Sequence, residues 1–162
     1  MKKFLMIICY VIMIVLVFSG CNTGALGQIE NITGISFKNI KVYNLYDTTG
    51  GVYGDGIMRA LISFKSQDDC ENVLLQIQEN SNWYELPVKN SSLKSFLFDS
   101  ETHTGRLSKN GINQVENGYY FFSPRNVDDP TDYDNLNYTI ISYVCALYDT
   151  DTNTFYFLGE WE

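Results

Sequence analysis

Four oxygen-bearing side chains near the carboxyl end of the chain have the spacing of a calcium-binding loop. Asp149, Asp151 and Asn153 alternate with threonines, and Glu160 follows them. Carboxylate and amide oxygens are the ligands that Ca²⁺ prefers, and these four match the first, third, fifth and twelfth loop positions. The sixth position requires glycine, whereas this chain has Thr154. Because Asp and Asn side chains bond their own backbone in turns, we expect a hairpin turn here and keep the metal site as the weaker alternative.

Two cysteines, Cys70 and Cys145, lie well inside the chain. In an oxidising compartment outside the cytoplasm these two residues could form a disulfide. The bond would close a loop of about 75 residues, worth about 4 kcal/mol in the chain-entropy model. The alternative is two buried free thiols that act as small apolar side chains. Sequence does not fix the separation of the two Cα atoms, so both alternatives stay open.

Other polar residues give little support for catalysis. The single histidine, His103, lies in a polar stretch, and one imidazole excludes a multi-histidine zinc site and offers poor support for a Ser/His triad. An acidic cluster suits a solvated loop better than a divalent-cation site; its members are Asp128, Asp129, Asp132 and Asp134. We therefore predict no catalytic residues, no metal and no cofactor.

Aromatic residues are the remaining candidates for ligand binding. Trp83, Tyr84 and Tyr119 could form a platform for a sugar or a peptide, because aromatic side chains are enriched at recognition surfaces. In a β-rich chain such residues more often pack in the core, and core packing is the role we expect. The sequence does not identify a ligand.

The beginning of the chain has the pattern of an export signal. Lys2 and Lys3 precede an apolar run over residues 4–18, and small residues follow it. A signal peptide needs a basic start and an apolar segment of about 7–15 residues. A spanning helix needs about 20 apolar residues, so this run is too short to be one. We predict a signal peptide over residues 1–20.

The stretch Phe18-Ser19-Gly20-Cys21 resembles the lipobox of bacterial lipoproteins, with Phe18 where leucine is usual. The resemblance implies a diacylglycerol on the Cys21 thiol, cleavage before Cys21, and acyl chains such as palmitate that anchor the protein. It places the protein on the extracytoplasmic face of the cell membrane. Residues 21–30 would then be the lipidated cysteine and a flexible tether, since 22–28 is small and polar.

The remainder, residues 31–162, is expected to be one β-rich globular domain. Its ending, with Asn-Tyr-Thr followed by Tyr-Asp-Thr-Asp-Thr-Asn, resembles small bacterial lipoproteins of uncharacterised function, which implies no activity. The formal charge of the chain is −8, and no cluster of Lys and Arg occurs. An acidic chain repels phosphate backbones, so we predict no nucleic-acid partner.

Periodicity of apolar residues predicts the elements. We expect strands at 35–45, with a bulge near Asn39, and at 57–64. A helix begins after Ser66, with an apolar stripe on one face; the stripe consists of Cys70, Val73, Leu74 and Ile77.

The second half of the chain is less regular. An extended segment is expected at 83–88, a short helix or strand at 92–98, and a polar loop over 99–110. A strand at 119–122 and a hairpin of 138–148 with 155–158 complete the prediction. The fold class is α+β, a mostly antiparallel sheet with one short amphipathic helix packed on a face, in a single domain.

These observations favour a membrane-tethered lipoprotein whose domain is a non-catalytic binding or interaction module for an envelope protein or glycan. One alternative is an exported cell-envelope hydrolase. Another is an immunity or inhibitor-type protein that blocks a partner. The missing catalytic motifs favour the first interpretation.

Overall fold

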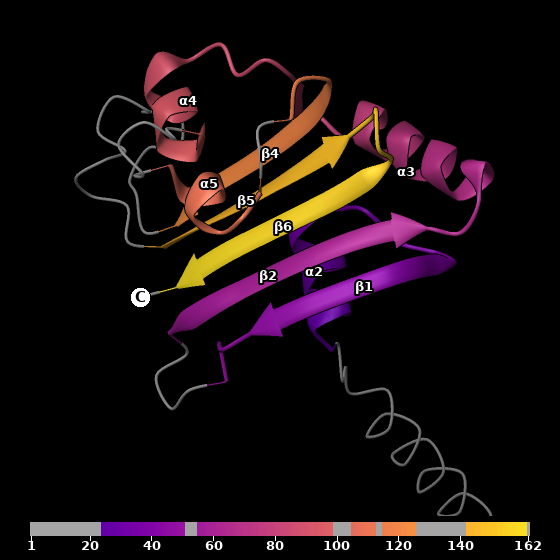
Figure 1. Ribbon diagram of the computed structural model, residues 1–162, viewed down its shortest axis with the longest axis horizontal. Helices are drawn as coiled ribbons and strands as arrows, with labels where there is room; N and C mark the ends of the chain where they lie inside the picture. The colour runs from indigo at the N-terminus through magenta and orange to yellow at the C-terminus, as the bar shows by residue number, and fades with distance from the viewer. Residues whose placement is uncertain (1–23, 51–54, 99–104, 113–114, 126–141, 162) are drawn as a thin grey trace, which may run out of the picture.

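Six strands form one antiparallel sheet in the order β1-β2-β6-β5-β4-β3 (Figure 1). The computed structural model describes residues 24–50, 55–98, 105–112, 115–125 and 142–161. The strands are β1 Ile40–Asp47, β2 Gly56–Phe64, β3 Trp83–Glu85, β4 Gly118–Arg125, β5 Ser142–Asp149 and β6 Thr154–Trp161. The described helices are α2 Ala25–Thr33, α3 Gln67–Glu79, α4 Ser91–Phe98 and α5 Arg106–Lys109. The predicted α+β single domain is confirmed, with more helices than the one expected.

Two groups of strands meet at the centre of the sheet. β1 and β2 form an antiparallel hairpin, and β3 to β6 follow one another as sheet neighbours. The antiparallel pairing of β2 with β6 joins the two groups. β5 is buried on both faces along almost its whole length, as its continuous apolar sequence predicts.

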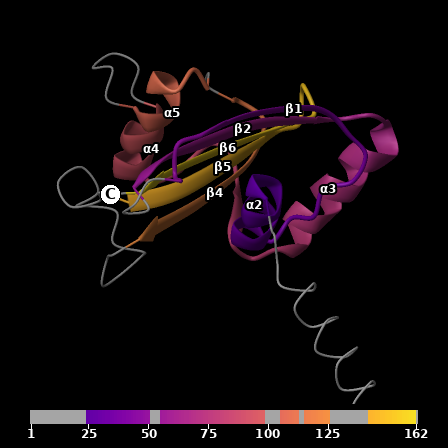
Figure 2. The same cartoon turned by 90° about the horizontal axis from the view of Figure 1, so that it is seen from below.

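Helices cover both faces of the sheet. Figure 2 shows α2 and α3 on one side, which we call the first face, and α4 and α5 on the other, the second face. β2 sends Met58, Ala60, Ile62 and Phe64 to the first face, where they are buried. This is the alternation predicted for that strand.

Helix α3 forms where the sequence predicts it. Ser66 is the N-cap residue, and its Oγ accepts a hydrogen bond from the Asp69 amide at 3.2 Å. Cys70, Val73 and Ile77 are buried against the first face. The cap fixes where the helix begins, and the stripe fixes which side faces the sheet.

The start of the globular domain differs from the prediction. The flexible tether expected over residues 21–30 is wrong from Ala25 onward, because helix α2 begins there and Ile29 is fully buried. The helix is held by Trp83, whose indole Nε1 donates to the Thr33 carbonyl oxygen at 3.0 Å. Tertiary packing therefore orders a segment whose composition is that of a tether.

The first predicted strand is shorter than expected. Ile35 and Phe37 are buried in the core but precede the strand, which begins at Ile40. The register with β2 shifts between Ile40 and Val42, close to the predicted bulge.

Two other segments are helical. Residues 91–98, expected to be a helix or a strand, form α4, and the polar loop expected over 99–110 contains α5. Helix α5 ends in a Schellman motif, in which the Ile112 amide donates to the Leu107 carbonyl and the Gly111 amide to that of Ser108. Gly111 has a φ of 75°, which suits glycine. Leu107 and Ile112 then join the core of the second face.

Cys70 and Cys145 are both free and buried, so the disulfide alternative is not realised. Cys70 packs in the core of the first face, and Cys145 in that of the second. The sheet lies between the two thiols. Burial raises the pKa of each thiol above its ordinary value, and neutral, inert thiols are the result.

We expect both thiols to resist alkylation in the folded protein. Iodoacetamide followed by peptide mapping should modify Cys70 and Cys145 only after a denaturant is added. A cross-linked peptide containing both residues, in protein prepared without reductant, would contradict the separation of the two thiols by the sheet.

Candidate functional site

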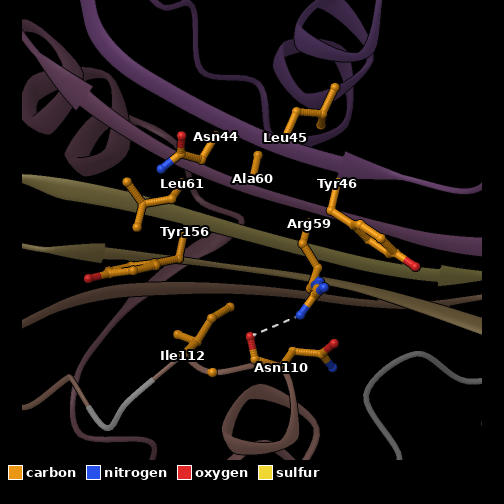
Figure 3. A pocket seen from close by; sticks show the side chains of 10 residues that line it. Asn44, Leu45, Tyr46, Arg59, Ala60, Leu61, Asn110, Ile112 and Tyr156 are labelled. Atoms are coloured by element: carbon orange, nitrogen blue, oxygen red, sulfur yellow. Dashed lines mark hydrogen bonds between the residues drawn. The ribbon is translucent and has the colours of Figure 1, made fainter.

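A groove opens on the second face of the sheet because α4 and α5 cover only part of it. It lies between the β1–β2 hairpin and the turn that follows α5 (Figure 3). Its volume is about 240 Å³. The residues used below are Tyr46, Arg59, Leu61, Asn110, Ile112 and Tyr156.

Strand register brings the walls of the groove together. Tyr46 of β1 is the cross-strand partner of Arg59 of β2. In the next row, Leu61 of β2 is paired with Tyr156 of β6. Directly opposed residues share a face of the sheet, so all four side chains project toward the groove. The Schellman motif after α5 supplies the opposite wall at Ile112.

Arg59 is the centre of the groove. Figure 3 shows its side chain reaching from β2 toward Asn110, with Tyr46 beside it. The Arg59 guanidinium carbon lies 4.6 Å from the centroid of the Tyr46 ring, within cation–π range. Arg59 Nη1 donates to the Asn110 carbonyl oxygen at 3.4 Å, a long hydrogen bond. The ring contact and the hydrogen bond restrain the guanidinium against the groove wall.

No carboxylate of the described residues forms an ion pair with Arg59. Arg59 Nε is buried and has no hydrogen-bond partner among the described residues. Within the same part of the chain, the one ion pair is between Arg106 and Glu160, so no carboxylate pairs with Arg59. A buried polar atom without a partner costs free energy. Within the part of the chain that the structure describes, the groove therefore presents a positive charge that could accept an anion.

The lining of the groove combines one cation with apolar and aromatic side chains. The ten residues that line the groove include no carboxylate, imidazole, thiol or serine hydroxyl. Nucleophilic and general acid–base catalysis usually depend on such groups. Apolar walls beside one cation instead suit a ligand with an apolar body and an anionic end.

A second polar cluster lies on the same face, nearer the core. The Tyr143 hydroxyl donates to Glu160 Oε2 at 2.6 Å, and Arg106 Nη1 lies 3.4 Å from the same oxygen. Arg106 also lies over the rings of Phe96 and Tyr143. Burial, with Cys145 and Glu160, raises the pKa of Tyr143 far above its usual value. Tyr143, Glu160 and Arg106 are thus partners of one another, and their contacts link α5 to β5 and β6.

The structure separates the four residues of the weak calcium candidate. Asp149 Oδ1 accepts hydrogen bonds from the amides of Asp151 and Thr152, as a turn residue does. Asn153 has a φ of 51° in the same hairpin turn. Glu160 pairs with Tyr143 at the other end of the hairpin. These residues do not converge on one point, and the hairpin-turn interpretation is confirmed.

The three aromatic candidates do not form one platform. Trp83 is buried and packs on Phe121 and Phe155. Tyr84, the next residue, is exposed and stacks near Tyr120 instead. The Tyr119 hydroxyl accepts a hydrogen bond from Gln78 Nε2 at 3.1 Å. The expected core packing is confirmed for Trp83, whereas Tyr119 is partly buried against the core and Tyr84 is 49% exposed.

Three of the sequence-based candidates lie outside the described residues. These are the lipidation residue Cys21, the histidine His103, and the acidic cluster Asp128, Asp129, Asp132 and Asp134.

Arg59 is the residue that sequence reasoning missed. Its signal was a single cation inside an otherwise apolar strand, Ile57-Met58-Arg59-Ala60-Leu61. On a half-exposed strand that pattern normally marks a solvent-facing position. Arg59 lies in a groove only because α5 and the turn after it pack opposite this part of β2.

A second hollow, of about 400 Å³, lies on the first face near α2 and has Arg125 and Trp161 in its wall. The Arg125 guanidinium carbon lies 5.8 Å from the Trp161 ring centroid. Arg125 is exposed, and this hollow contains no buried polar atom that lacks a partner among the described residues. The Arg59 groove is therefore the stronger candidate.

Comparisons with protein-family models, curated proteins and solved structures give no match to this chain. Among the described residues, no helix has both the length and the apolar character needed to cross a bilayer.

Two tyrosines allow a matched test of the polar contacts. The Tyr143 hydroxyl bonds a carboxylate, whereas the Tyr43 hydroxyl is buried without a partner among the described residues. We expect Tyr143→Phe to lower the free energy of unfolding by about 1.5–3 kcal/mol, the range for hydrogen bonds to charged groups. Tyr43→Phe should leave it unchanged or raise it slightly. Urea denaturation of both variants measures the difference, and equal losses would be inconsistent with these contacts.

Proposed function

We propose that this protein is an extracytoplasmic bacterial lipoprotein whose domain is a non-catalytic binding module. Cys21 is its lipid attachment site, and the Arg59 groove is its ligand site. The ligand presents a carboxylate on a short apolar body. The observation that carries this proposal is the Arg59 guanidinium, which lies between apolar walls and forms no ion pair among the described residues.

The chemistry of arginine supports a carboxylate ligand. A guanidinium presents its donors in a planar fork that matches the two oxygens of a carboxylate. Tyr46 covers one side of the Arg59 side chain and Asn110 restrains its end. A donor that is held in place loses less conformational entropy on binding. A carboxylate in the groove would neutralise a guanidinium that forms no ion pair among the described residues.

The size of the groove limits the ligand. A volume of about 240 Å³ lies just below the range of about 300–1,000 Å³ that is typical of small-molecule pockets. A short carboxylate, such as the end of a peptide of an envelope protein, suits it better than a whole sugar chain. The leucine and isoleucine in the walls favour an apolar group next to the carboxylate.

The support for anchoring comes from the sequence, in Lys2, Lys3, the apolar run and Ser19-Gly20-Cys21. The position of α2 adds a consequence. Only residues 22–24 lie between Cys21 and the first residue of α2. A chain extends by at most about 3.6 Å per residue, so a lipid on Cys21 would hold the domain close to the membrane surface.

Lipidation can be tested directly. We expect radiolabelled palmitate to enter the wild-type protein and to be lost in the Cys21→Ser variant, because the acyl chains require that thiol. Labelling is measured after expression in a bacterium that processes lipoproteins, and Cys70→Ser is the matched control. Equal labelling of wild type and Cys21→Ser would refute the anchor.

Carboxylate binding can be tested with hexanoate as the probe. We expect hexanoate to shift the NMR signals of Tyr46, Leu61 and Tyr156, and the neutral analogue hexanol to shift them much less. Arg59→Met should weaken hexanoate binding at least about tenfold, because hydrogen bonds to charged groups are worth about 1.5–3 kcal/mol. The matched control Arg125→Met removes a positive charge elsewhere and should bind normally. If both variants bind hexanoate like the wild type, the groove is not the site.

A further inference from the structure

The outer edge of β1 lacks the features that usually protect an edge strand. Among the described residues β1 pairs with β2 alone, so its other side is unpaired. Natural edges are usually blocked by charges, proline, bulges or short length. The central run Val42-Tyr43-Asn44-Leu45-Tyr46 contains no charge and no proline, and the register shift lies before it. The opposite edge, β3, has three residues and is protected by its shortness.

The backbone groups that point outward are set by the register. The Thr48 amide donates to the Ile57 carbonyl at 2.9 Å, so Thr48 faces β2. Inward and outward positions alternate along an antiparallel strand. Tyr43, Leu45 and Asp47 therefore direct their amide and carbonyl groups away from β2. A further strand on that side could form hydrogen bonds with them.

The charges at the two ends of β1 are complementary. Lys41 is three residues before Asn44, and Asp47 is three residues after it. Both end residues are exposed. We propose that β1 pairs antiparallel with β1 of a second copy of this chain, about a two-fold axis at Asn44.

In this register the two copies form the same ion pairs and backbone hydrogen bonds with each other. Lys41 of each copy faces Asp47 of the other, which gives two ion pairs. Tyr43 faces Leu45 across the axis, and their outward backbone groups form hydrogen bonds. Asn44 faces Asn44.

Neighbouring registers are less favourable. Moving the axis to Tyr43 or Leu45 keeps the hydrogen-bond pattern but removes the pairing of Lys41 with Asp47. An axis midway between two residues would pair each outward-facing backbone position with an inward-facing one. Side chains from opposite faces of the sheet would then lie opposite each other. The charge pattern therefore selects one arrangement.

The same arrangement would cover two exposed apolar side chains of β1. Leu45 and Tyr46 are 40% and 50% exposed, and each would gain a cross-strand neighbour from the second copy, Tyr43 and Val42 respectively. The two-fold axis is perpendicular to the sheet, so both Arg59 grooves lie on the same face of the dimer. The dimer does not require the proposed ligand or the lipid anchor.

Disulfide trapping of the full-length purified protein tests the pairing. Residues that face each other in a non-hydrogen-bonded antiparallel pair have Cα atoms about 4.5 Å apart, within disulfide range. We expect Asn44→Cys to form a covalent dimer on mild oxidation, scored above the wild-type parent on a non-reducing gel. Asn72→Cys, on the exposed side of α3, is the matched control. Equal trapping of the two variants would overturn the proposal.

Charge reversal tests the register. In the Asn44→Cys background, Lys41→Asp or Asp47→Lys should each reduce the trapped fraction, and the dimer dissociation constant should rise up to about tenfold, because two exposed ion pairs become two repulsions. The double variant Lys41→Asp/Asp47→Lys should restore dimerisation. Failure of a folded double variant to do so would refute this register.

Asp47 also accepts hydrogen bonds within its turn, from the amide and the hydroxyl of Thr49. A further variant therefore avoids this residue. Leu45→Pro removes an amide that points away from β2, so the β1–β2 hairpin should persist while dimerisation is lost. Retained dimerisation in a folded Leu45→Pro protein would refute the β1–β1 pairing.

Discussion

The pairing of β2 with β6 is the interaction on which the rest of the structure depends. It joins the first hairpin to the strands β3 to β6 and makes one continuous sheet from two groups. Without it, the first-face core would lose the contact of Ala60 and Ile62 with Phe155 and Phe157, all of them buried. Since these strands are far apart in sequence, the loop-closure entropy has to be overcome before the core can form.

The groove follows from unequal coverage of the two faces. Helices α2 and α3 pack beneath the first face (Figure 2), whereas α4 and α5 leave the β1–β2 part of the second face open. The same open region holds Arg59 and borders the unpaired edge of β1. The proposed ligand site and the proposed pairing with a second copy therefore share one structural cause, a sheet wider than the helices that cover it.

Local patterns predicted the elements whose signals are complete within a few residues. Strand β2 has apolar residues at every second position from Met58 to Phe64, α3 has the Ser66 cap and an apolar stripe, and the β5–β6 hairpin has a turn of Asp, Thr and Asn. Two helices were missed because their signals are weak. Helix α2 lacks a side-chain N-cap and contains Gly27, and it is ordered by its packing against Trp83. Helix α5 is short, and its Gly111 signal becomes meaningful only once Leu107 and Ile112 meet in the core.

The sequence alone determined the fold class, the core face of β2 and of α3, and the hairpin turn at Asp149, because each is encoded in residue patterns that are local in the sequence. The tertiary structure decided the state of Cys70 and Cys145, since the sheet between them separates the thiols. It also decided the role of Arg59. In the sequence this residue is one cation in an apolar strand, and only the turn after α5, which lies about fifty residues later, encloses it in a groove.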